Sequence, residues 1–172
     1  MPRSNEQKRS LRQEQKTAKE LNGRTTPASG SRWHSKGDIR SDRFLIECKT
    51  TTKDSYRLTA KTWEKIANEA LRDGIREPTM RIDVCNDFGD TVSFIVMYSW
   101  AYDVLCKMNL GSGCFNFMRF SEERNSYLVK TDHEYAITRF MLFGEKYHDV
   151  VIFSWGLFVD FLFYRLLGEG SN

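Results

Sequence analysis

Two carboxylates and an ammonium group lie close together in the sequence, at Asp38, Glu47 and Lys49. Paired carboxylates bind Mg²⁺ through oxygen ligands and leave coordination positions for water and phosphate oxygens. A metal held in this way lowers the pKa of a bound water, and a nearby lysine orients or deprotonates that water or stabilises the phosphate during transfer. These are the residue types that a metal-dependent phosphodiesterase needs.

A β-hairpin would bring the three side chains together. Residues 44–48 form a short apolar run interrupted only by Glu47, which predicts a strand. Successive side chains of a strand point to opposite faces, so Glu47 and Lys49 share one face, about 7 Å apart. The polar residues 40–43 suit a tight connection, and they place Asp38 beside Glu47.

The opposite face of the same strand carries Phe44, Ile46 and Cys48, which we expect in a hydrophobic core. Cys48 fits a core position better than a catalytic one. The spacing of the charged residues also fits an ordinary solvated strand face with a cross-strand ion pair. The pattern by itself therefore leaves both interpretations open.

A helix is predicted over residues 13–24, ending near Gly23, because glycine commonly follows the last residue of a helix. The loop after it contains Ser29 and Ser31, and its small residues would let backbone N–H groups approach a phosphate or a metal-bound water. A proline and a glycine in the same loop equally favour a plain turn.

Several segments of the first half follow one another in a distinctive order. They are Gln13-Glu14, Gly23-Arg24, Pro27-Ala28-Ser29-Gly30, Lys36-Gly37-Asp38-Ile39, Ile46-Glu47-Cys48-Lys49-Thr50, Ser55-Tyr56-Arg57-Leu58 and Trp63-Glu64-Lys65-Ile66. Together they resemble the PD-(D/E)xK nuclease superfamily, and within it the phage and archaeal-type Holliday junction resolvases. The resemblance covers about residues 8–85.

The resemblance implies a role for each member of the charged cluster. Asp38 and Glu47 would be metal ligands, the backbone carbonyl of Cys48 would add a further ligand, and Lys49 would be the catalytic lysine. The implied metal is Mg²⁺, with Mn²⁺ as a substitute.

A glutamate of the first helix would complete the acidic cluster. Glu14 is the better candidate, because Gln13-Glu14 precedes Ala18 as in the family pattern, and Glu20 is the second choice. Both glutamates also fit solvated positions on a helix. The superfamily's proline before the aspartate is replaced here by Gly37.

Charge is distributed unevenly along the chain. The first 65 residues carry 16 Lys and Arg against 8 Asp and Glu, whereas the remaining 107 carry 10 against 15. A basic half that contains the candidate site favours a polyanionic partner, bound with little sequence information. We expect residues 1–10 to form a flexible basic arm, whose alternative role is solubility. The candidate DNA-binding residues are Arg12, Lys16, Arg24, Ser29, Ser31, Arg32, Lys36, Lys53 and Ser55.

With 172 residues, 40% of them hydrophobic, the chain can form one domain with a sizeable core. The resemblance implies an α/β (α+β) fold in which a restriction-endonuclease-like mixed sheet is flanked by helices. The nuclease domain would span residues 11–172, with a core at 11–100 and a C-terminal elaboration of extra strands and a helix at 101–172. Strands are expected at 80–85, 92–98, 114–120, 126–131, 139–143 and 149–155, and helices at 59–73, 102–108 and 157–167.

The spacing of the four cysteines fits neither a zinc site nor a disulfide framework; they are Cys48, Cys85, Cys106 and Cys114. We therefore expect the protein in a reducing cytoplasm. If the protein is phage-encoded, this would be the cytoplasm of the host. No secretory signal is visible. The apolar run 150–167 contains Asp160 and Arg165, so we interpret it as a strand followed by a buried helix rather than a membrane span.

The sequence thus predicts a Mg²⁺-dependent endonuclease that cuts branched DNA, such as Holliday junctions, in recombination or repair. Because the resolvases that the chain resembles cut two opposed strands symmetrically, the resemblance also implies a homodimer. The alternatives are a nuclease of the same fold acting on flaps, forks or duplex DNA, and a catalytically silent DNA-binding accessory protein in recombination.

Overall fold

The computed structural model of the chain describes residues 4–26, 37–85, 90–110, 118–121, 126–131 and 137–168. Its helices are α1 (Asn5–Glu20), α2 (Ala60–Asp73), α3 (Ser99–Leu110) and α4 (Trp155–Gly168). Its strands are β1 (Arg24–Thr25), β2 (Ile39–Arg40), β3 (Phe44–Thr51), β4 (Ser55–Thr59), β5 (Glu77–Cys85), β6 (Thr91–Tyr98), β7 (Met118–Ser121), β8 (Ser126–Lys130), β9 (Ile137–Phe143) and β10 (Tyr147–Ser154).

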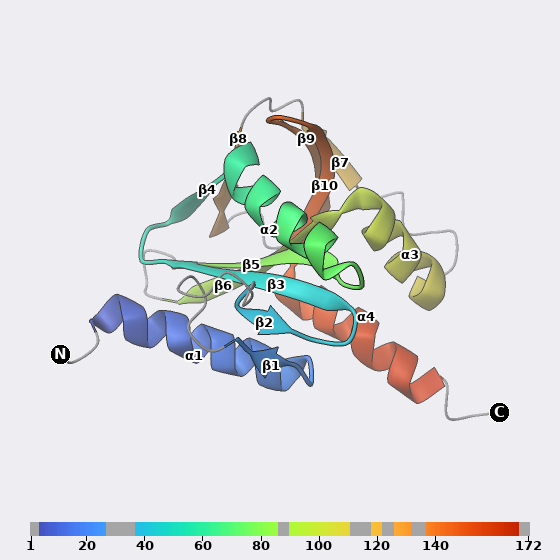
Figure 1. The fold of residues 1–172 in the computed structure, drawn as a ribbon, viewed down its shortest axis with the longest axis horizontal. Helices are drawn as coiled ribbons and strands as arrows, with labels where there is room; N and C mark the ends of the chain where they lie inside the picture. The colour runs from blue at the N-terminus through green and yellow to red at the C-terminus, as the bar shows by residue number, and fades with distance from the viewer. Residues whose placement is uncertain are drawn as a thin grey trace.

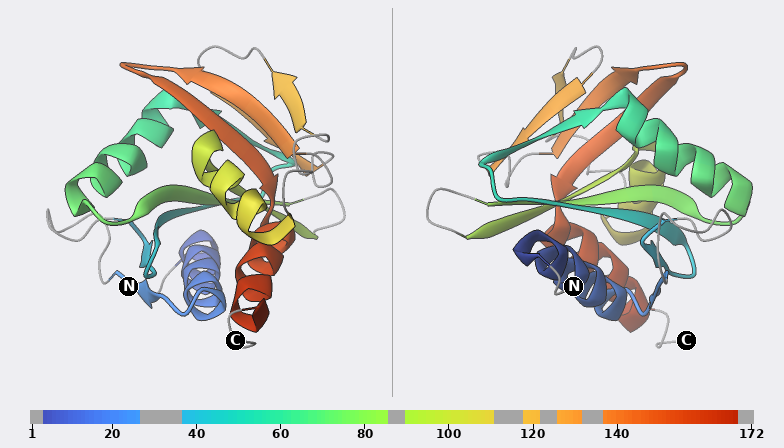
Figure 2. Two further views of the ribbon diagram at one scale, coloured as in Figure 1. Left: turned by 90° about the vertical axis from the view of Figure 1, so that its right-hand side faces the viewer. Right: turned by 60° about the vertical axis from the view of Figure 1, so that its left-hand side comes forward.

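Within the described residues, eight strands form one mixed sheet in the order β1-β2-β3-β5-β6-β10-β9-β7. The pairs β3–β5 and β7–β9 are parallel and the others are antiparallel. The sheet is strongly twisted, so β9 and β10 run steeply across β3 and β5 (Figure 2). The expected class, a mixed sheet flanked by helices, is confirmed.

Both faces of the sheet are covered. On one face α1, α3 and α4 pack over a core that includes Phe44, Ile46 and Cys48, and α1 and α4 lie side by side there (Figures 1 and 2). On the other face α2 packs over a second core that includes Leu45 and Trp63. The alternation predicted for residues 44–48 is therefore confirmed, and it places β3 between two cores.

Residues 5–10, which the sequence analysis assigns to a basic arm, form the first turns of α1. Ser4 accepts a hydrogen bond from the Gln7 N–H at 3.2 Å, and the Gln7 side chain accepts one from the Ser4 N–H at 2.9 Å. This reciprocal capping box satisfies N–H groups that the start of a helix otherwise leaves unpaired.

The second half of the chain completes the same sheet, because β10 pairs with β6 and β9 pairs with β10. The strand expected at 126–131 is present but pairs with β4 in a separate two-stranded sheet. Of the strand expected at 114–120, residues 114–117 lie outside the described part. None of the described helices is both long and apolar enough to cross a membrane.

Candidate active site

Among the described residues, the short strand β2 covers only part of one edge of β3. β2 pairs with β3 only at Leu45 and Ile46. Immediately before β2, the Asp38 N–H donates to the Ile46 carbonyl at 2.9 Å, and Asp38 Oδ2 accepts from the Cys48 N–H at 2.8 Å. The Asp38 carboxylate thus accepts the hydrogen bond that a longer β2 would accept from Cys48. This bond fixes the carboxylate beside Glu47.

Gly37 sets the approach of the chain to Asp38. Its φ is +66°, a left-handed conformation that glycine adopts easily and that proline cannot reach. A Cβ there would lie 2.7 Å from Leu45 Cδ1. The Gly37 N–H donates to Glu69 Oε2 of α2 at 2.9 Å, a bond that proline would also lose. A proline at position 37 would therefore not fit this backbone.

Glu47 is buried, and its Oε1 accepts from Lys49 Nζ at 2.6 Å and from Lys65 Nζ at 3.0 Å. Burial alone would raise the pKa of Glu47, but the hydrogen bonds and charges of the two ammonium groups outweigh it and lower the pKa. Glu47 is therefore ionised at neutral pH, as a metal ligand must be.

The pKa of Lys49, in contrast to that of Glu47, is raised by its surroundings. Burial would lower the pKa of Lys49, but the hydrogen bond and charge of Glu47 raise it, with smaller contributions from Tyr56 and Asp38. Lys49 is therefore an ammonium group at neutral pH. In this state it can donate hydrogen bonds and stabilise negative charge, whereas it cannot accept a proton from water.

Glu14 of α1 faces the same cluster. Its pKa is raised by burial and by the charges of Asp38 and Glu47, against the hydrogen bond from Ser10 and the charge of Lys49. Ser10 Oγ donates to Glu14 Oε1 at 3.1 Å. The helix therefore brings a third carboxylate within electrostatic range of the other two.

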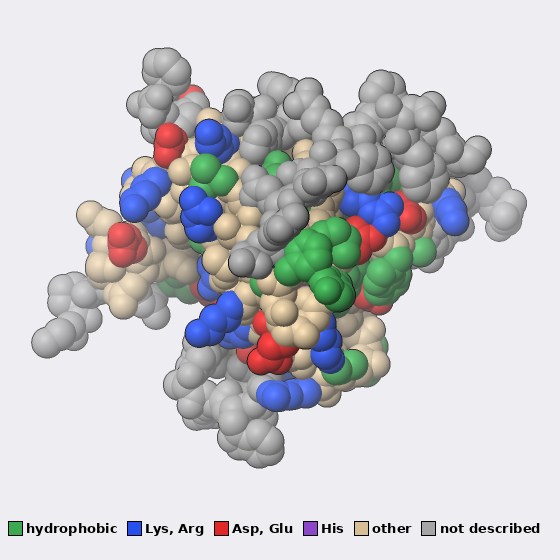
Figure 3. Space-filling view, turned by 90° about the horizontal axis from the view of Figure 1, so that it is seen from above, with side chains coloured by type: hydrophobic (Ala, Val, Ile, Leu, Met, Phe, Trp, Pro, Cys, Tyr) green, Lys and Arg blue, Asp and Glu red, His purple; other side chains and the backbone are tan. Residues whose placement is uncertain are grey.

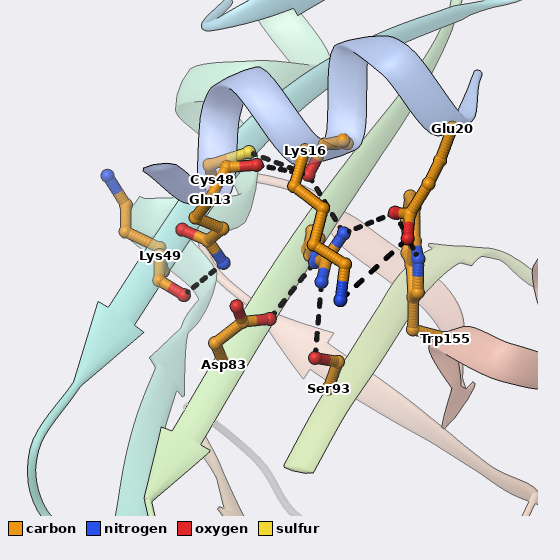
Figure 4. A network of polar contacts seen from close by, with 10 residues as sticks. Gln13, Lys16, Glu20, Cys48, Lys49, Asp83, Ser93 and Trp155 are labelled. Carbon is orange, nitrogen blue, oxygen red and sulfur yellow. Dashed lines mark hydrogen bonds and ion pairs between the residues drawn. The ribbon is translucent and has the colours of Figure 1, made fainter. Parts of the chain in front are cut away.

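Glu20 lies in a different network. Its Oε2 accepts from Arg81 Nη1 and from Trp155 Nε1, both at 2.9 Å (Figure 4). Asp83 accepts from Arg81 Nε at 3.0 Å in this network. The geometry therefore favours Glu14 over Glu20 as the third carboxylate.

The donor types around Asp38 fit a hard divalent cation. Carboxylates come from Glu14, Asp38 and Glu47, and the Cys48 carbonyl points to the same edge of β3 as its N–H, toward Asp38. The raised pKa of Glu14 shows that its carboxylate is disfavoured partly by its acidic neighbours, which a cation would relieve. Within the described residues, however, no three His, Cys, Asp or Glu side chains are grouped closely enough to hold a metal as they stand.

The other predicted site residues lie around this cluster or outside the described part. Arg12 and Lys16 are exposed on α1, and Arg24 is exposed in β1. Lys53 is exposed in the turn after β3, and Ser55 begins β4, where its Oγ donates to Asp54. Ser29, Ser31, Arg32 and Lys36 fall in the range 27–36, outside the described residues.

Sequence reasoning assigned no role to three side chains that contact or influence the cluster. Lys65 pairs with Glu47, Tyr56 lies within electrostatic range of Lys49, and Gln13 Nε2 donates to the Lys49 carbonyl at 3.0 Å. Lys65 lies one helical turn before Glu69, on the flank of the buried face of α2. That spacing is visible in the sequence, but the contact with β3 is not.

Comparisons with known proteins do not add a family to these observations. No protein-family model, no curated protein and no solved structure matches the chain. The functional interpretation therefore depends on the residues of the site and their geometry.

Proposed function

We propose that this protein is a Mg²⁺-dependent endonuclease that hydrolyses phosphodiester bonds in branched DNA, with four-way junctions as its main substrate. The observation that carries the proposal is the convergence of Asp38, Glu47 and Lys49 at β3, with Glu14 reaching the same cluster from α1. Carboxylates and an ammonium group in this arrangement suit phosphate chemistry better than they suit a solvated strand face, because Glu47 is buried.

In the proposed mechanism, Glu14, Asp38, Glu47 and the Cys48 carbonyl would hold the metal. When bound, Mg²⁺ supplies a water of lowered pKa and neutralises charge on the phosphate. Lys49, already an ammonium group, donates to a phosphate oxygen and stabilises the charge that develops there.

Lys65 acts as a positioning residue in this scheme. It lies 3.0 Å from the Glu47 oxygen that also contacts Lys49. When Lys49 turns from Glu47 toward the phosphate, Lys65 keeps a positive charge beside the buried carboxylate. Glu47 would thus keep an ammonium partner, besides the metal, while Lys49 moves.

A cleavage assay tests the proposed function. The wild-type protein is incubated with a four-way junction, a flap and a linear duplex at matched salt, with Mg²⁺ or with EDTA. We expect cleavage of the junction with Mg²⁺ and none with EDTA. Asp38→Asn should lose cleavage by at least about a hundredfold while it keeps junction binding. Wild-type cleavage by this variant would refute the assignment of Asp38.

One observation favours a second candidate, a catalytically silent DNA-binding accessory protein. The two ammonium groups on Glu47 already neutralise that carboxylate in the absence of metal. Calorimetric titration with Mg²⁺ separates the candidates. An enzyme should release or absorb heat as Mg²⁺ binds through Asp38 and Glu47, and Asp38→Asn should remove this heat. A silent protein should give the same result with and without the substitution. Preferential cutting of the flap or the duplex would instead indicate a nuclease of a different substrate class.

A further inference from the structure

A groove of about 330 Å³ lies between α1 and the strands β3, β5 and β6. From α1 it is lined by Arg9, Arg12, Gln13 and Lys16, and from the strands by Thr50, Arg81, Asp83, Cys85, Thr91 and Ser93. The described lining therefore consists mostly of cations, hydroxyl groups and an amide. These are the groups with which proteins contact the sugar–phosphate backbone of nucleic acids.

The positive charge of the groove comes from α1. Arg81, in the floor, is already paired with Glu20 at 2.9 Å and Asp83 at 3.0 Å, so it adds little net charge. Arg9 and Arg12 are exposed, and Lys16 pairs with Glu20 only at 3.8 Å with two thirds of its side chain exposed. Exposed pairs of this kind are weak and are easily replaced by a polyanion.

The floor of the groove is rigid. The Arg81 side chain is buried, donates to Thr17 Oγ1 at 2.9 Å and lies over the Trp155 ring, 4.3 Å from its centroid. Arg81 Nη2 donates to Ser93 Oγ at 3.3 Å (Figure 4). Because Ser93 accepts from Arg81, its own O–H is left to donate to another acceptor.

The groove adjoins the candidate active site but lies on the other side of α1. Gln13 lines the groove and donates to the Lys49 carbonyl, and Thr50 follows Lys49 directly. The Lys49 side chain extends away from Asp83 and Ser93 (Figure 4), whereas the next residue of α1, Glu14, faces Asp38. One helix thus presents a carboxylate to the catalytic cluster and cations to the groove.

We propose that this groove binds the phosphodiester backbone of the DNA strand that is cut, at phosphates that neighbour the scissile one. The inference rests on the proposed nuclease function and adds the path of the strand, which crosses the end of β3 at Thr50 and continues between α1 and β6. Contacts to phosphate carry no sequence information, so the groove fixes the position of the strand rather than its sequence.

The first test removes the cations of one wall. Binding of a fluorescently labelled four-way junction is measured by anisotropy in EDTA, over a range of salt concentrations, for Arg9→Ala, Arg12→Ala and Lys16→Ala. Each variant should bind on the order of three- to tenfold more weakly, and the slope of log K against log[salt] should decrease by about 0.9 for each lost phosphate contact. Lys107→Ala on α3, an exposed cation outside the groove, is the matched control and should behave as wild type.

The second test uses the opposite wall. Thr91 is exposed at the start of β6, so a side chain there can change without loss of core packing. Thr91→Glu places a negative charge in the groove and should weaken binding, whereas Thr91→Gln, of similar size and without charge, should bind close to wild type. Circular dichroism confirms that each variant is folded.

Unchanged affinity and salt slope in both the α1 variants and Thr91→Glu would overturn the groove proposal. Because these measurements need neither metal nor cleavage, they are independent of the proposed activity. A protein that does not cut DNA but responds to the groove variants would disprove the nuclease and keep the binding groove. A protein that cuts DNA but whose affinity does not change in the groove variants would disprove the binding groove and keep the nuclease.

Discussion

At the residue scale, the chemistry of the candidate site depends on how neighbouring charges set the protonation of each group. Glu47 binds two lysines through one oxygen atom, which keeps the carboxylate ionised and holds Lys49 as an ammonium group. Glu14, in contrast, is pushed toward its protonated form by burial and by Asp38. The cluster therefore combines an ionised carboxylate, a charged lysine and a carboxylate whose ionisation a cation would favour.

Lys49→Ala should lower the rate of junction cleavage by about a hundred- to a thousandfold, because a donor to the charged transition state is lost. The pKa of Lys49 lies above the ordinary value of 10.5, so the residue stays charged throughout the range from pH 7 to 10. The titration of Lys49 then adds no slope to the pH–rate profile in this range. The profiles of Lys49→Ala and the wild type should therefore be parallel. A slope that disappears in Lys49→Ala would show instead that Lys49 acts as the base.

Glu14→Gln should raise the thermal midpoint of the metal-free protein at neutral pH while it weakens Mg²⁺ binding. The pKa of Glu14 is raised in the folded state, so folding favours the protonated form, and stability is lost as the pH rises from 4.5 through the folded-state pKa. At pH 7 the ionised side chain is therefore unfavourable, and glutamine removes that cost but still accepts from Ser10. Thermal melts at pH 4 and pH 7 measure the difference, and a lower midpoint for Glu14→Gln at pH 7 would contradict the sign.

At the element scale, α1 and β3 position almost everything that the proposed function uses. The helix predicted at 59–73 begins one residue later, as α2. The strand predicted at 44–48 continues to Thr51, as β3, because its last residues are polar and fall outside the apolar run. The start of α1 was missed because residues 5–12 are almost entirely polar, although Ser4 and Gln7 have the spacing of a capping box. The pairing of β4 with β8 was also missed, since periodicity indicates a strand but not its distant partner.

The same limit applies to the candidate site. The order of short segments identified Asp38, Glu47 and Lys49, and their convergence follows from one hairpin-like turn close in sequence. Lys65 joins them from α2 through a contact between residues 18 positions apart. Local patterns therefore find charged residues on one strand and its neighbour more readily than their partners from another layer.

Ser4→Ala should destabilise the first turns of α1 by about 1 kcal/mol, because the N-terminal N–H groups lose their cap. Arg9 and Arg12 lie in these turns, so DNA affinity should fall slightly along with helix stability. Hydrogen exchange of amides 5–10, which should become faster in Ser4→Ala, measures the effect. Ser4→Asp, which retains a capping oxygen, is the matched control and should exchange as slowly as wild type.

At the scale of the whole molecule, the structure leaves several large apolar side chains exposed near α2 and α3. Leu71 is 74% exposed, Ile75 78% and Trp100 52%. The first two line a groove with Tyr98, whose ring stacks on that of Trp100. Hydrophobic side chains also gather on the face shown in Figure 3. Such a patch favours an interaction surface, and the proposed cutting of two opposed strands favours a second copy of this chain as the partner.

Sedimentation equilibrium should therefore show a dimer. Leu71→Glu combined with Ile75→Glu should shift it to a monomer, because charges placed at the centre of an apolar contact are desolvated without a partner. Leu71→Met with Ile75→Met, which keeps the surface apolar, is the control. A wild-type protein that sediments as a monomer at micromolar concentration would exclude this interface.

The left-handed backbone at Gly37 also determines how the candidate site can change by mutation. A side chain at this position meets Leu45, but a smaller residue at 45 would remove only the steric overlap and not the strain of a φ of +66°. In a genetic selection for activity, Gly37→Val should therefore not be rescued by second-site changes at Leu45. Reversion to glycine should dominate among the recovered sequences, with asparagine or aspartate as rarer solutions.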